Sequence, residues 1–374
     1  MKMKKLFNED SSPDSNFDWR KIVAENTPGT ASPQQMVRQE LLAKLETALS
    51  AWTAKHEISQ ERVGQVAYYA ATVCPVDTPY EQVQLLAQYI LWLFWFDKYD
   101  LLDLSDPSAK SHLEHEFHTL TEVLCINSGL SIEKPTSFGL FAHPIGDSRF
   151  CETSKLGMDL SQTLIEILDN LMQIWERLFP DEPEANRVFR LSNCMEWLAA
   201  TLAAAKQEIL KSFDYIHNKN LPSGSLDDYL KETGEISISL PATLAFLNSF
   251  DMSPEAIWLC AFPAILESSR IIRLANDLGN YWNELKELKF NSITMALLQL
   301  GFEPFGDYTE SSLEIIQATV VVKQRLQIAI NDFVTHFRDV PEGMVSHFLW
   351  HGTALALAMY EPGDFVIPNS IGSV

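Results

Sequence analysis

Apolar and polar residues follow one another along most of this chain with the spacing of amphipathic helices. From about Gln34 onward, apolar positions recur three and four residues apart, and alternating runs of β-branched residues are scarce. Clusters of turn-forming residues interrupt this pattern, and each cluster predicts the end of one helix and the start of the next. They lie at residues 75–79, 105–108, 127–154, 179–184, 217–225, 251–254 and 301–309. The pattern predicts an all-α fold of roughly ten helices without internal repeats.

The domain organisation is indicated by a change in composition near residue 33. The segment before it is polar and rich in Ser, Pro, Asp and Asn, which is typical of a loosely ordered segment. We expect residues 1–33 to form a flexible N-terminal arm, residues 34–366 one helical domain, and residues 367–374 a short C-terminal tail. A chain of 374 residues is long enough to bury a large core in that one domain.

The charge and the cysteines narrow the range of functions. The chain has 28 Lys and Arg residues against 50 Asp and Glu residues, and this net charge of −22 repels nucleic acids and anionic membrane surfaces. An anionic substrate would therefore require metal cations at its site. The five cysteines are scattered without a CxxC pair, and the most apolar run, residues 89–96, is too short to span a bilayer. We expect a cytoplasmic protein with no nucleic-acid partner and no stable membrane insertion.

A first acidic motif follows a strongly apolar helix at residues 89–103, YILWLFWFDKYDLLD. Asp97 and Asp100 are three residues apart, so they share one helix face and can together hold a divalent cation. Asp103 is rotated by about 120° from Asp97 and is the weaker candidate. The alternative is a helix that simply ends in a solvated acidic stretch, although carboxylates at a helix C-terminus oppose the helix dipole unless a cation compensates them.

A second polar motif lies at residues 270–287, RIIRLANDLGNYWNELKE. Asn276, Asn280 and Glu284 are spaced i, i+4 and i+8, so each turns about 40° and rises about 6 Å from the one before. Three oxygen-bearing side chains then form one stripe suited to a hard cation. Arg273 lies one turn earlier on nearly the same face, where a guanidinium can bind diphosphate oxygens. The alternative is an ordinary polar helix face containing an Arg–Asp pair.

These two motifs together resemble those of the class I terpene synthases. That family carries an aspartate-rich motif on one helix and an Asn/Asp–Ser/Thr–Glu triad on a later, facing helix, separated by a similar length of chain. Three further stretches are also similar to the family, namely SLDDYLKETG after Pro222, NSIT at residues 291–294, and MYEPGDF at residues 359–365. The resemblance covers roughly residues 34–365 and implies a single-domain helical bundle around a central apolar active-site cavity.

The chain departs from the family pattern at several positions. Lys98 stands where the family usually has a second adjacent aspartate, and Asn280 replaces the usual Ser or Thr of the triad. Thr233 occupies the position of the effector arginine that bacterial members commonly carry, and Lys231 is the nearest basic substitute. Met359 precedes Tyr360 where the family commonly has an arginine, so recognition of the diphosphate would depend mainly on Arg273.

The resemblance implies a reaction and assigns residues to it. A magnesium-dependent enzyme of this family ionises a prenyl diphosphate, steers the carbocation and releases diphosphate, commonly with three Mg²⁺ ions for which Mn²⁺ can substitute. The expected metal ligands are Asp97, Asp100, Asn276, Asn280 and Glu284. The residues expected to act in catalysis are Asp97, Asp100, Arg273 and Tyr360. The expected substrate-binding residues are Arg273, Lys231, Phe94 and Trp197, the last two as aromatic walls that stabilise a cation or, alternatively, as ordinary core side chains.

The substrate and the oligomeric state stay open at the level of sequence. A C20 substrate is favoured, either geranylgeranyl diphosphate or a bicyclic product of a class II cyclase, which would place this enzyme downstream of such a cyclase. A C15 sesquiterpene synthase is the first alternative. A chain-elongating prenyl diphosphate synthase and a non-catalytic helical protein that binds an apolar ligand are the others. The protein is expected to be a monomer or a homodimer.

Overall fold

A computed structural model describes residues 18–26, 32–57, 59–97, 184–222, 224–233 and 256–361, together with single residues between 106 and 181. The described residues form helices and connecting turns and contain no strand, which confirms the all-α prediction. The helices are α1 (Trp19–Asn26), α2 (Pro33–Lys55), α3 (Val63–Val73), α4 (Tyr80–Asp97), α7 (Glu184–Asn218), η3 (Ile257–Ala261), α10 (Phe262–Lys286), α11 (Ser292–Gln299), α12 (Leu313–Phe337) and α13 (Met344–Tyr360). A further short helix covers residues 226–233.

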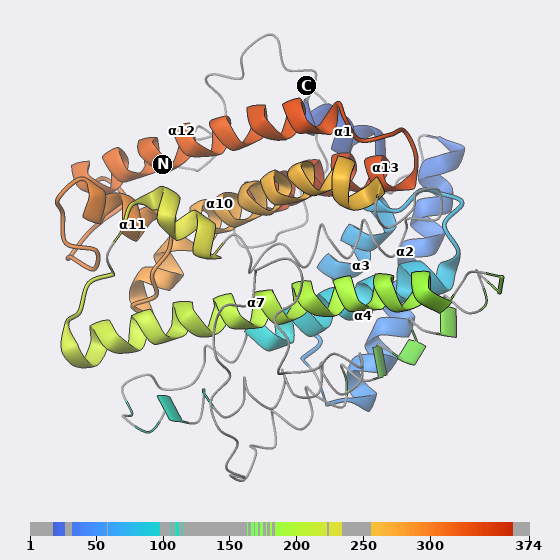
Figure 1. The fold of residues 1–374 in the computed structure, drawn as a ribbon, viewed down its shortest axis with the longest axis horizontal. Helices are drawn as coiled ribbons and strands as arrows, with labels where there is room; N and C mark the ends of the chain where they lie inside the picture. The colour runs from blue at the N-terminus through green and yellow to red at the C-terminus, as the bar shows by residue number, and fades with distance from the viewer. Residues whose placement is uncertain are drawn as a thin grey trace.

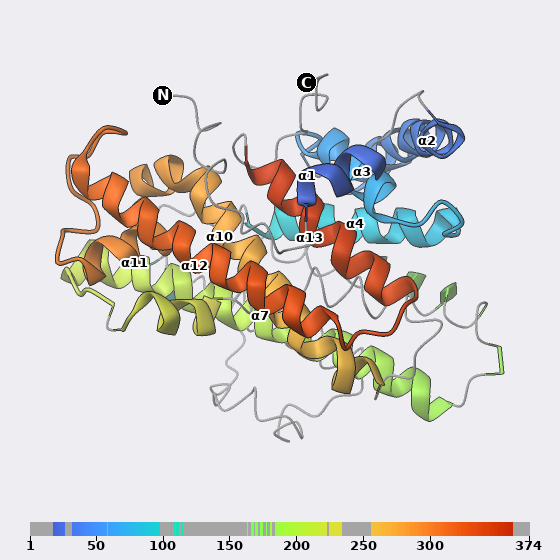
Figure 2. The ribbon, with the colours of Figure 1, turned by 90° about the horizontal axis from the view of Figure 1, so that it is seen from above.

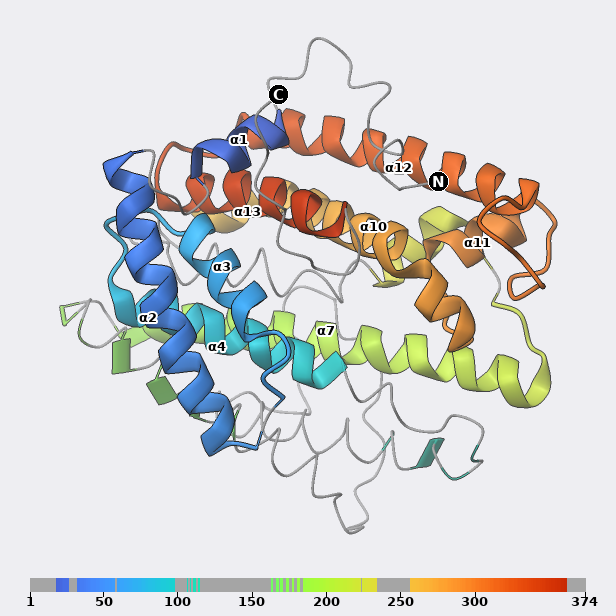
Figure 3. The ribbon, with the colours of Figure 1, turned by 180° about the vertical axis from the view of Figure 1, so that it is seen from behind.

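Three long helices, α7, α10 and α12, extend along the longest axis of the molecule, and the N-terminal helices α1 to α4 gather with α13 at one end (Figure 1). α10 packs against α11, α12 and α13, and the hydroxyl groups of Ser268 and Thr353 lie 2.7 Å apart where α10 meets α13. α4, α7 and α10 run in the same direction, from right to left in Figure 1 and from left to right in Figure 3. Two elements of the predicted site, the end of α4 and the second half of α10, therefore point towards the same end of the molecule.

The predicted helix breaks that fall within the described residues are confirmed. α3 ends and α4 begins around the turn at residues 75–79, α7 ends at the start of the 217–225 cluster, and the 301–309 cluster lies between α11 and α12. The start of α2 shows the local cause. The Ser32 hydroxyl accepts a hydrogen bond from the backbone N–H of Gln35 at 3.2 Å, and Pro33 supplies the first helical residue.

The prediction of a flexible arm over residues 1–33 is wrong for Trp19–Asn26, which form α1. Asp18 accepts a hydrogen bond from the Lys21 N–H at 3.2 Å, and Val23 is fully buried as α1 packs against α13. Three apolar residues in this otherwise polar segment, Trp19, Ile22 and Val23, indicate the helix. Ile22 and Val23 follow Trp19 by three and four residues, so all three lie on one helix face. A single buried helical turn of this kind is too short to stand out from its surroundings.

Among the helices that the structure describes, none has the length and apolar character needed to cross a bilayer.

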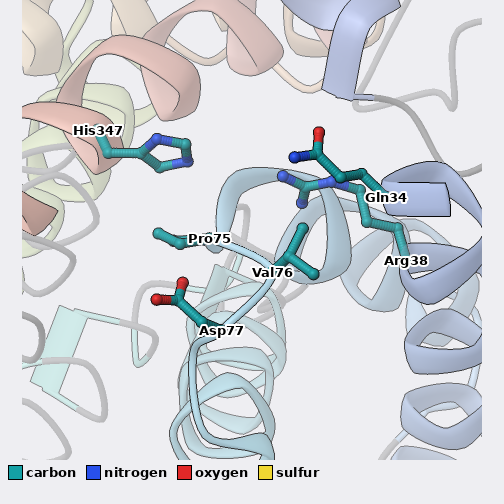
Figure 4. Close-up of a pocket in the computed structure, with 6 residues that line it drawn as sticks. All are labelled: Gln34, Arg38, Pro75, Val76, Asp77 and His347. Carbon is teal, nitrogen blue, oxygen red and sulfur yellow. The ribbon is translucent and has the colours of Figure 1, made fainter. Parts of the chain in front are cut away.

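The junction of α2, α3 and α13 contains a buried arginine. Arg38 of α2 donates from Nη1 to the carbonyl oxygens of Ala71, Thr72 and Cys74, at 2.7–2.8 Å, and so binds the C-terminal end of α3. Beside it opens a cavity of about 540 Å³ lined by Gln34, Arg38, Pro75, Val76, Asp77 and His347 (Figure 4). None of the predicted site residues lines this cavity, so it is distinct from the central apolar cavity that the resemblance implies.

Two histidines of α13 lie in contact with each other near this arginine, with their rings tilted by 41°. The rings of His347 and His351 lie 4.0 Å apart between centroids. Burial lowers the pKa of His347 to about 4, with a further contribution from the Arg38 charge. Burial, His347 and Arg38 together lower the pKa of His351 to about 3. Both rings are therefore neutral in the folded protein at neutral pH.

These pKa shifts predict a loss of stability in mild acid. Below pH 6.5 the unfolded chain binds protons at both histidines while the folded chain does not, so the free energy of unfolding falls as the pH falls from about 6.5 towards 4. We expect a loss of about 2–3 kcal/mol between pH 7 and 5.5 by urea unfolding. The double variant His347→Gln/His351→Gln should be less pH-dependent over this range. The exposed His336→Gln change should leave the slope unaltered, and a wild-type slope retained in the double variant would contradict the assignment.

Candidate functional site

The predicted triad lies on one uninterrupted helix. α10 spans Phe262–Lys286, so Asn276, Asn280 and Glu284 have the helical spacing that the sequence predicted. Asn276 and Asn280 are partly exposed, whereas Glu284 is buried. Asn280 accepts a hydrogen bond from the Asn283 amide at 2.8 Å, and Asn276 makes no side-chain hydrogen bond to any residue that the structure describes.

Arg273 is the centre of a buried polar network. Its Nη2 lies 2.5 Å from Oε1 of Glu208 on α7 and donates to the hydroxyl oxygen of Tyr229, also at 2.5 Å. Its Nε lies 3.0 Å from Oδ1 of Asp277, an ion pair without an aligned hydrogen bond. Burial lowers the pKa of Arg273, but the charges of Asp277 and Glu208 outweigh burial and raise it well above its usual value. The Arg–Asp pair that the alternative interpretation of this motif expected is therefore present, within a larger network.

Asp277 connects this network to the next helix. Its side chain is fully buried, and Oδ2 accepts hydrogen bonds from both the backbone N–H (2.7 Å) and the hydroxyl of Ser292, the first residue of α11. The Tyr229 hydroxyl lies 3.5 Å from the same oxygen. A carboxylate at the N-terminus of α11 also interacts favourably with the helix dipole. Asp277 thus links α10, α11 and the helix at residues 226–233.

Glu284 is held by the N-cap residue of the same helix α11. Asn291 accepts from the Thr294 N–H at 2.9 Å while the Thr294 hydroxyl accepts from the Asn291 N–H at 2.8 Å, which is a reciprocal capping box. The Asn291 amide nitrogen then donates to Oε2 of Glu284 at 2.8 Å. Burial raises the pKa of Glu284 well above its usual value, and the neighbouring Asp277 charge adds to the rise. The NSIT stretch that resembles the terpene synthase family is the segment that holds this carboxyl group.

The first acidic motif is described only in part. The described part of α4 extends to Asp97, the first residue of the motif, but the Asp97 side chain and all of Asp100 lie outside the described residues. Phe94 is partly buried against the core, and its ring centroid lies 5.2 Å from the Arg62 guanidinium at the start of α3. The side chain of Trp197, on α7, also lies outside the described residues.

Two further predicted site residues, Lys231 and Tyr360, make no described contact with the Arg273 network. The side chain of Lys231 is 70% exposed, because Lys231 follows the buried Tyr229 by two residues and therefore lies on the opposite face of their helix. Its Nζ lies 3.8 Å from Oδ1 of Asp228. Tyr360 is buried at the C-terminal end of α13, near Tyr69 of α3. The role of Tyr360 in catalysis stays a prediction.

Sequence reasoning missed Glu208 and the partnership of Tyr229 with Arg273. Glu208 is a single carboxylate in the alanine-rich part of α7, and 65 residues separate it from Arg273. The local sequence, KQEILK at residues 206–211, looks like an ordinary polar helix segment and gave no signal of a buried carboxylate. Nothing in the spacing along the chain could select its partner.

The donor types around α10 suit a hard cation more than zinc. The described residues contain no group of three or more His, Cys, Asp or Glu side chains placed to hold a metal ion. The predicted triad contributes only one such residue, Glu284, and two amide side chains. Carboxylate and amide oxygens are ligands that Mg²⁺ accepts, usually alongside water and substrate phosphates.

Comparison with models of known protein families gives no match to this chain, and comparison with curated proteins gives none either.

The Arg273 network predicts a large difference in stability between two arginine substitutions. Arg273→Met leaves the buried carboxylates of Glu208 and Asp277 without their cation, and we expect the free energy of unfolding to fall by about 3 kcal/mol or more. Arg325→Met is the matched control, because Arg325 pairs at 2.6 Å with Asp227, which is 62% exposed, and should cost about 0–1 kcal/mol. Urea unfolding at neutral pH measures both. Equal losses would contradict a network buried from solvent.

Proposed function

We propose that this chain is a Mg²⁺-dependent class I terpene synthase that ionises a prenyl diphosphate and directs the resulting carbocation to a hydrocarbon or an alcohol. The proposal rests on the resemblance of the motifs and on the arrangement of charges on α10. No cofactor other than Mg²⁺, with Mn²⁺ as a substitute, is required.

One observation supports the proposal most directly. Glu208, Asp277 and Glu284 bring three carboxyl groups to the vicinity of a single guanidinium, that of Arg273. Ionisation of all three leaves the site negatively charged, so an anionic substrate could bind only together with cations. Burial and the neighbouring negative charge of Asp277 raise the pKa of Glu284, which shows that its ionised form lacks a nearby compensating cation. A divalent cation would supply it.

The residues of the triad fit such a cation. Glu284 uses Oε2 to accept from Asn291, which leaves Oε1 as a ligand, and the carbonyl oxygen of the partly exposed Asn276 has no partner among the described residues. Asn280 adds a third oxygen on the same face. When bound, Mg²⁺ would neutralise the charge that develops on the diphosphate leaving group.

Arg273 would bind and orient the diphosphate from a fixed position. Glu208, Tyr229 and Asp277 occupy Nη2 and Nε, whereas Nη1 makes no hydrogen bond to a described residue. A guanidinium immobilised on two sides loses little entropy when its remaining nitrogen donates to an anion. The same contacts keep Arg273 charged throughout the working pH range.

The other parts of the mechanism stay proposals. Asp97 and Asp100 would supply the facing cation ligands, Phe94 and Trp197 would line the cavity for the carbocation, and Tyr360 would contribute near the diphosphate. A C20 substrate is favoured, either geranylgeranyl diphosphate or a bicyclic class II product, and C15 farnesyl diphosphate is the next candidate.

The central test is turnover with and without Mg²⁺. We expect the wild-type chain with geranylgeranyl diphosphate to release diphosphate and a terpene only when Mg²⁺ is present, as measured by ion chromatography of inorganic diphosphate and gas chromatography of the terpene. Glu284→Gln keeps the side-chain shape and an acceptor for Asn291 but removes the charge, so kcat/KM should fall about 100-fold or more. The matched control is Glu287→Gln, an exposed glutamate just past the end of α10, which should leave activity unchanged.

The alternatives give different results in the same assay. A longer prenyl diphosphate as the product would identify a chain-elongating synthase. Binding of the substrate without any diphosphate release would support a non-catalytic binding protein. Full activity of Glu284→Gln, or activity in the presence of a chelator, would contradict the metal assignment.

Asn291 is expected to position Glu284 for the cation. Asn291→Ser keeps an N-cap oxygen for α11 but cannot donate the 2.8 Å hydrogen bond to Glu284. We expect the Mg²⁺ concentration for half-maximal activity to rise roughly 10-fold, as for loss of other outer contacts to a metal ligand, with little change in melting temperature. The Mg²⁺-induced rise in melting temperature should become smaller as well, which measures binding without turnover.

Asn291→Ala provides the comparison, because it removes both the cap and the hydrogen bond to Glu284. It should additionally cost about 1 kcal/mol of stability. If Asn291→Ser and the wild type require the same Mg²⁺ concentration, Asn291 acts only as a helix cap.

A further inference from the structure

The cavity at the junction of α2, α3 and α13 has a charged floor and a polar rim. Its volume of about 540 Å³ is within the usual range for sites that hold small metabolites. Arg38 is 4% exposed and His347 is half-buried, so these two side chains form the floor. Gln34, Val76 and Asp77 are exposed and form the rim. A ligand would therefore meet the guanidinium deep in the cavity and the Asp77 carboxylate near its opening.

The hydrogen bonds from Nη1 of Arg38 do not neutralise its charge. They run to three backbone carbonyl oxygens at the end of α3, at 2.7–2.8 Å, and these acceptors carry no formal charge. Burial lowers the pKa of Arg38, and the opposing effect of Cys74 does not restore it. The guanidinium is therefore less stable as a cation here than in water. A carboxylate brought next to it would stabilise it.

His347 adds no charge to the floor of the cavity. Its ring donates a hydrogen bond to the backbone carbonyl of Val73, and its pKa of about 4 keeps it neutral at neutral pH. The lining then has one positive charge, from Arg38, and one negative charge, from Asp77. A ligand that carried only an anion or only a cation would leave one of these two charges unmatched.

The two charges reach the cavity from different segments. Arg38 extends from α2, whereas Asp77 belongs to the turn between α3 and α4 (Figure 4). Pro75 and Val76 lie between them in this view and supply an apolar wall. Val76 is 37% exposed, so the carbon atoms of a ligand would cover apolar surface there. The lining thus presents a cation, an apolar wall and an anion in that order.

We propose that this cavity binds a small amino-carboxylate, with its carboxylate at Arg38, its ammonium group at Asp77 and the connecting carbon atoms against Val76. Such a zwitterion carries no net charge, so the net charge of −22 on the chain does not repel it as it repels a free anion. The Gln34 amide at the rim can bind either charged group of the ligand. None of the residues of the Arg273 network lines the cavity, so this site does not depend on the proposed function.

Isothermal titration calorimetry of the full chain with three matched probes tests the class of ligand. γ-Aminobutyrate carries both charged groups, butyrate lacks the ammonium group, and butylamine lacks the carboxylate. We expect γ-aminobutyrate to bind with a dissociation constant in the millimolar range, and each single-charge probe to bind at least about 10-fold more weakly. These probes test the charge of Arg38 without a substitution, which would also release the end of α3.

Two outcomes of this titration would overturn the proposal. One is a wild-type chain that binds none of the three probes. The other is butyrate or butylamine binding as tightly as γ-aminobutyrate, which would show that the cavity recognises a single charge.

Asp77→Asn tests the position of the ammonium group, because it removes the carboxylate at the rim but keeps the shape of the side chain. We expect γ-aminobutyrate to bind about 10-fold more weakly to this variant, and butyrate to bind equally well or better because a repulsive charge is gone. The matched control is Asp307→Asn, an exposed aspartate between α11 and α12, at the other end of the molecule from the cavity (Figure 1). It removes the same charge from the chain and should bind γ-aminobutyrate like the wild type. Equal affinities of Asp77→Asn and the wild type would overturn the assignment.

Val76→Ser tests the contact with the connecting carbon atoms. Glycine has only one carbon atom between its charged groups, so we expect it to bind several-fold more weakly than γ-aminobutyrate to the wild type. This difference should become smaller in Val76→Ser, because the longer ligand then covers less apolar surface. Both rim residues are exposed, so the melting temperatures of their variants should stay close to that of the wild type. Glycine binding to the wild type as tightly as γ-aminobutyrate would contradict the proposed placement.

Discussion

A guanidinium buried between carboxylates from two helices is the interaction on which the arrangement of this protein depends. Arg273 binds Glu208 of α7 and the Tyr229 hydroxyl, and its ion pair with Asp277 continues to the first residue of α11. Ionised groups removed from water are stable only when their partners are close and well placed. Four segments of the chain must therefore meet at this one side chain, which limits how α10 can sit relative to its neighbours.

The same network explains why a cation is expected beside it. The buried charges around Arg273 are not balanced, since Glu284 adds a third carboxyl group that the guanidinium does not contact. The proposed magnesium site is also consistent with the overall acidity of the chain. An anionic substrate is repelled both by the net negative charge of the protein and by the carboxylates of the site, so it can bind only where cations neutralise that charge.

Much of the fold could be predicted from local pattern. Apolar spacing and turn clusters placed the helices from about Gln34 onward, because helix periodicity depends on residues within a few positions of each other. The local pattern did not predict helices that form only because a short segment is buried against the rest of the protein. Trp19–Asn26 is a helix because α13 covers Val23, and the polar residues around it did not indicate that contact.

In the candidate site, too, the features set by local helix geometry were predictable and those set by helix packing were not. Sequence alone determined that Asn276, Asn280 and Glu284 share a stripe on one helix, since the rotation per residue settles this without reference to the rest of the chain. Only the tertiary structure decided that Glu208 is the partner of Arg273 and that the N-cap of α11 holds Glu284. Those pairings join residues that are distant in sequence or separated by a turn. They arise from how the helices pack, and many acidic side chains along the chain could have served equally well by composition alone.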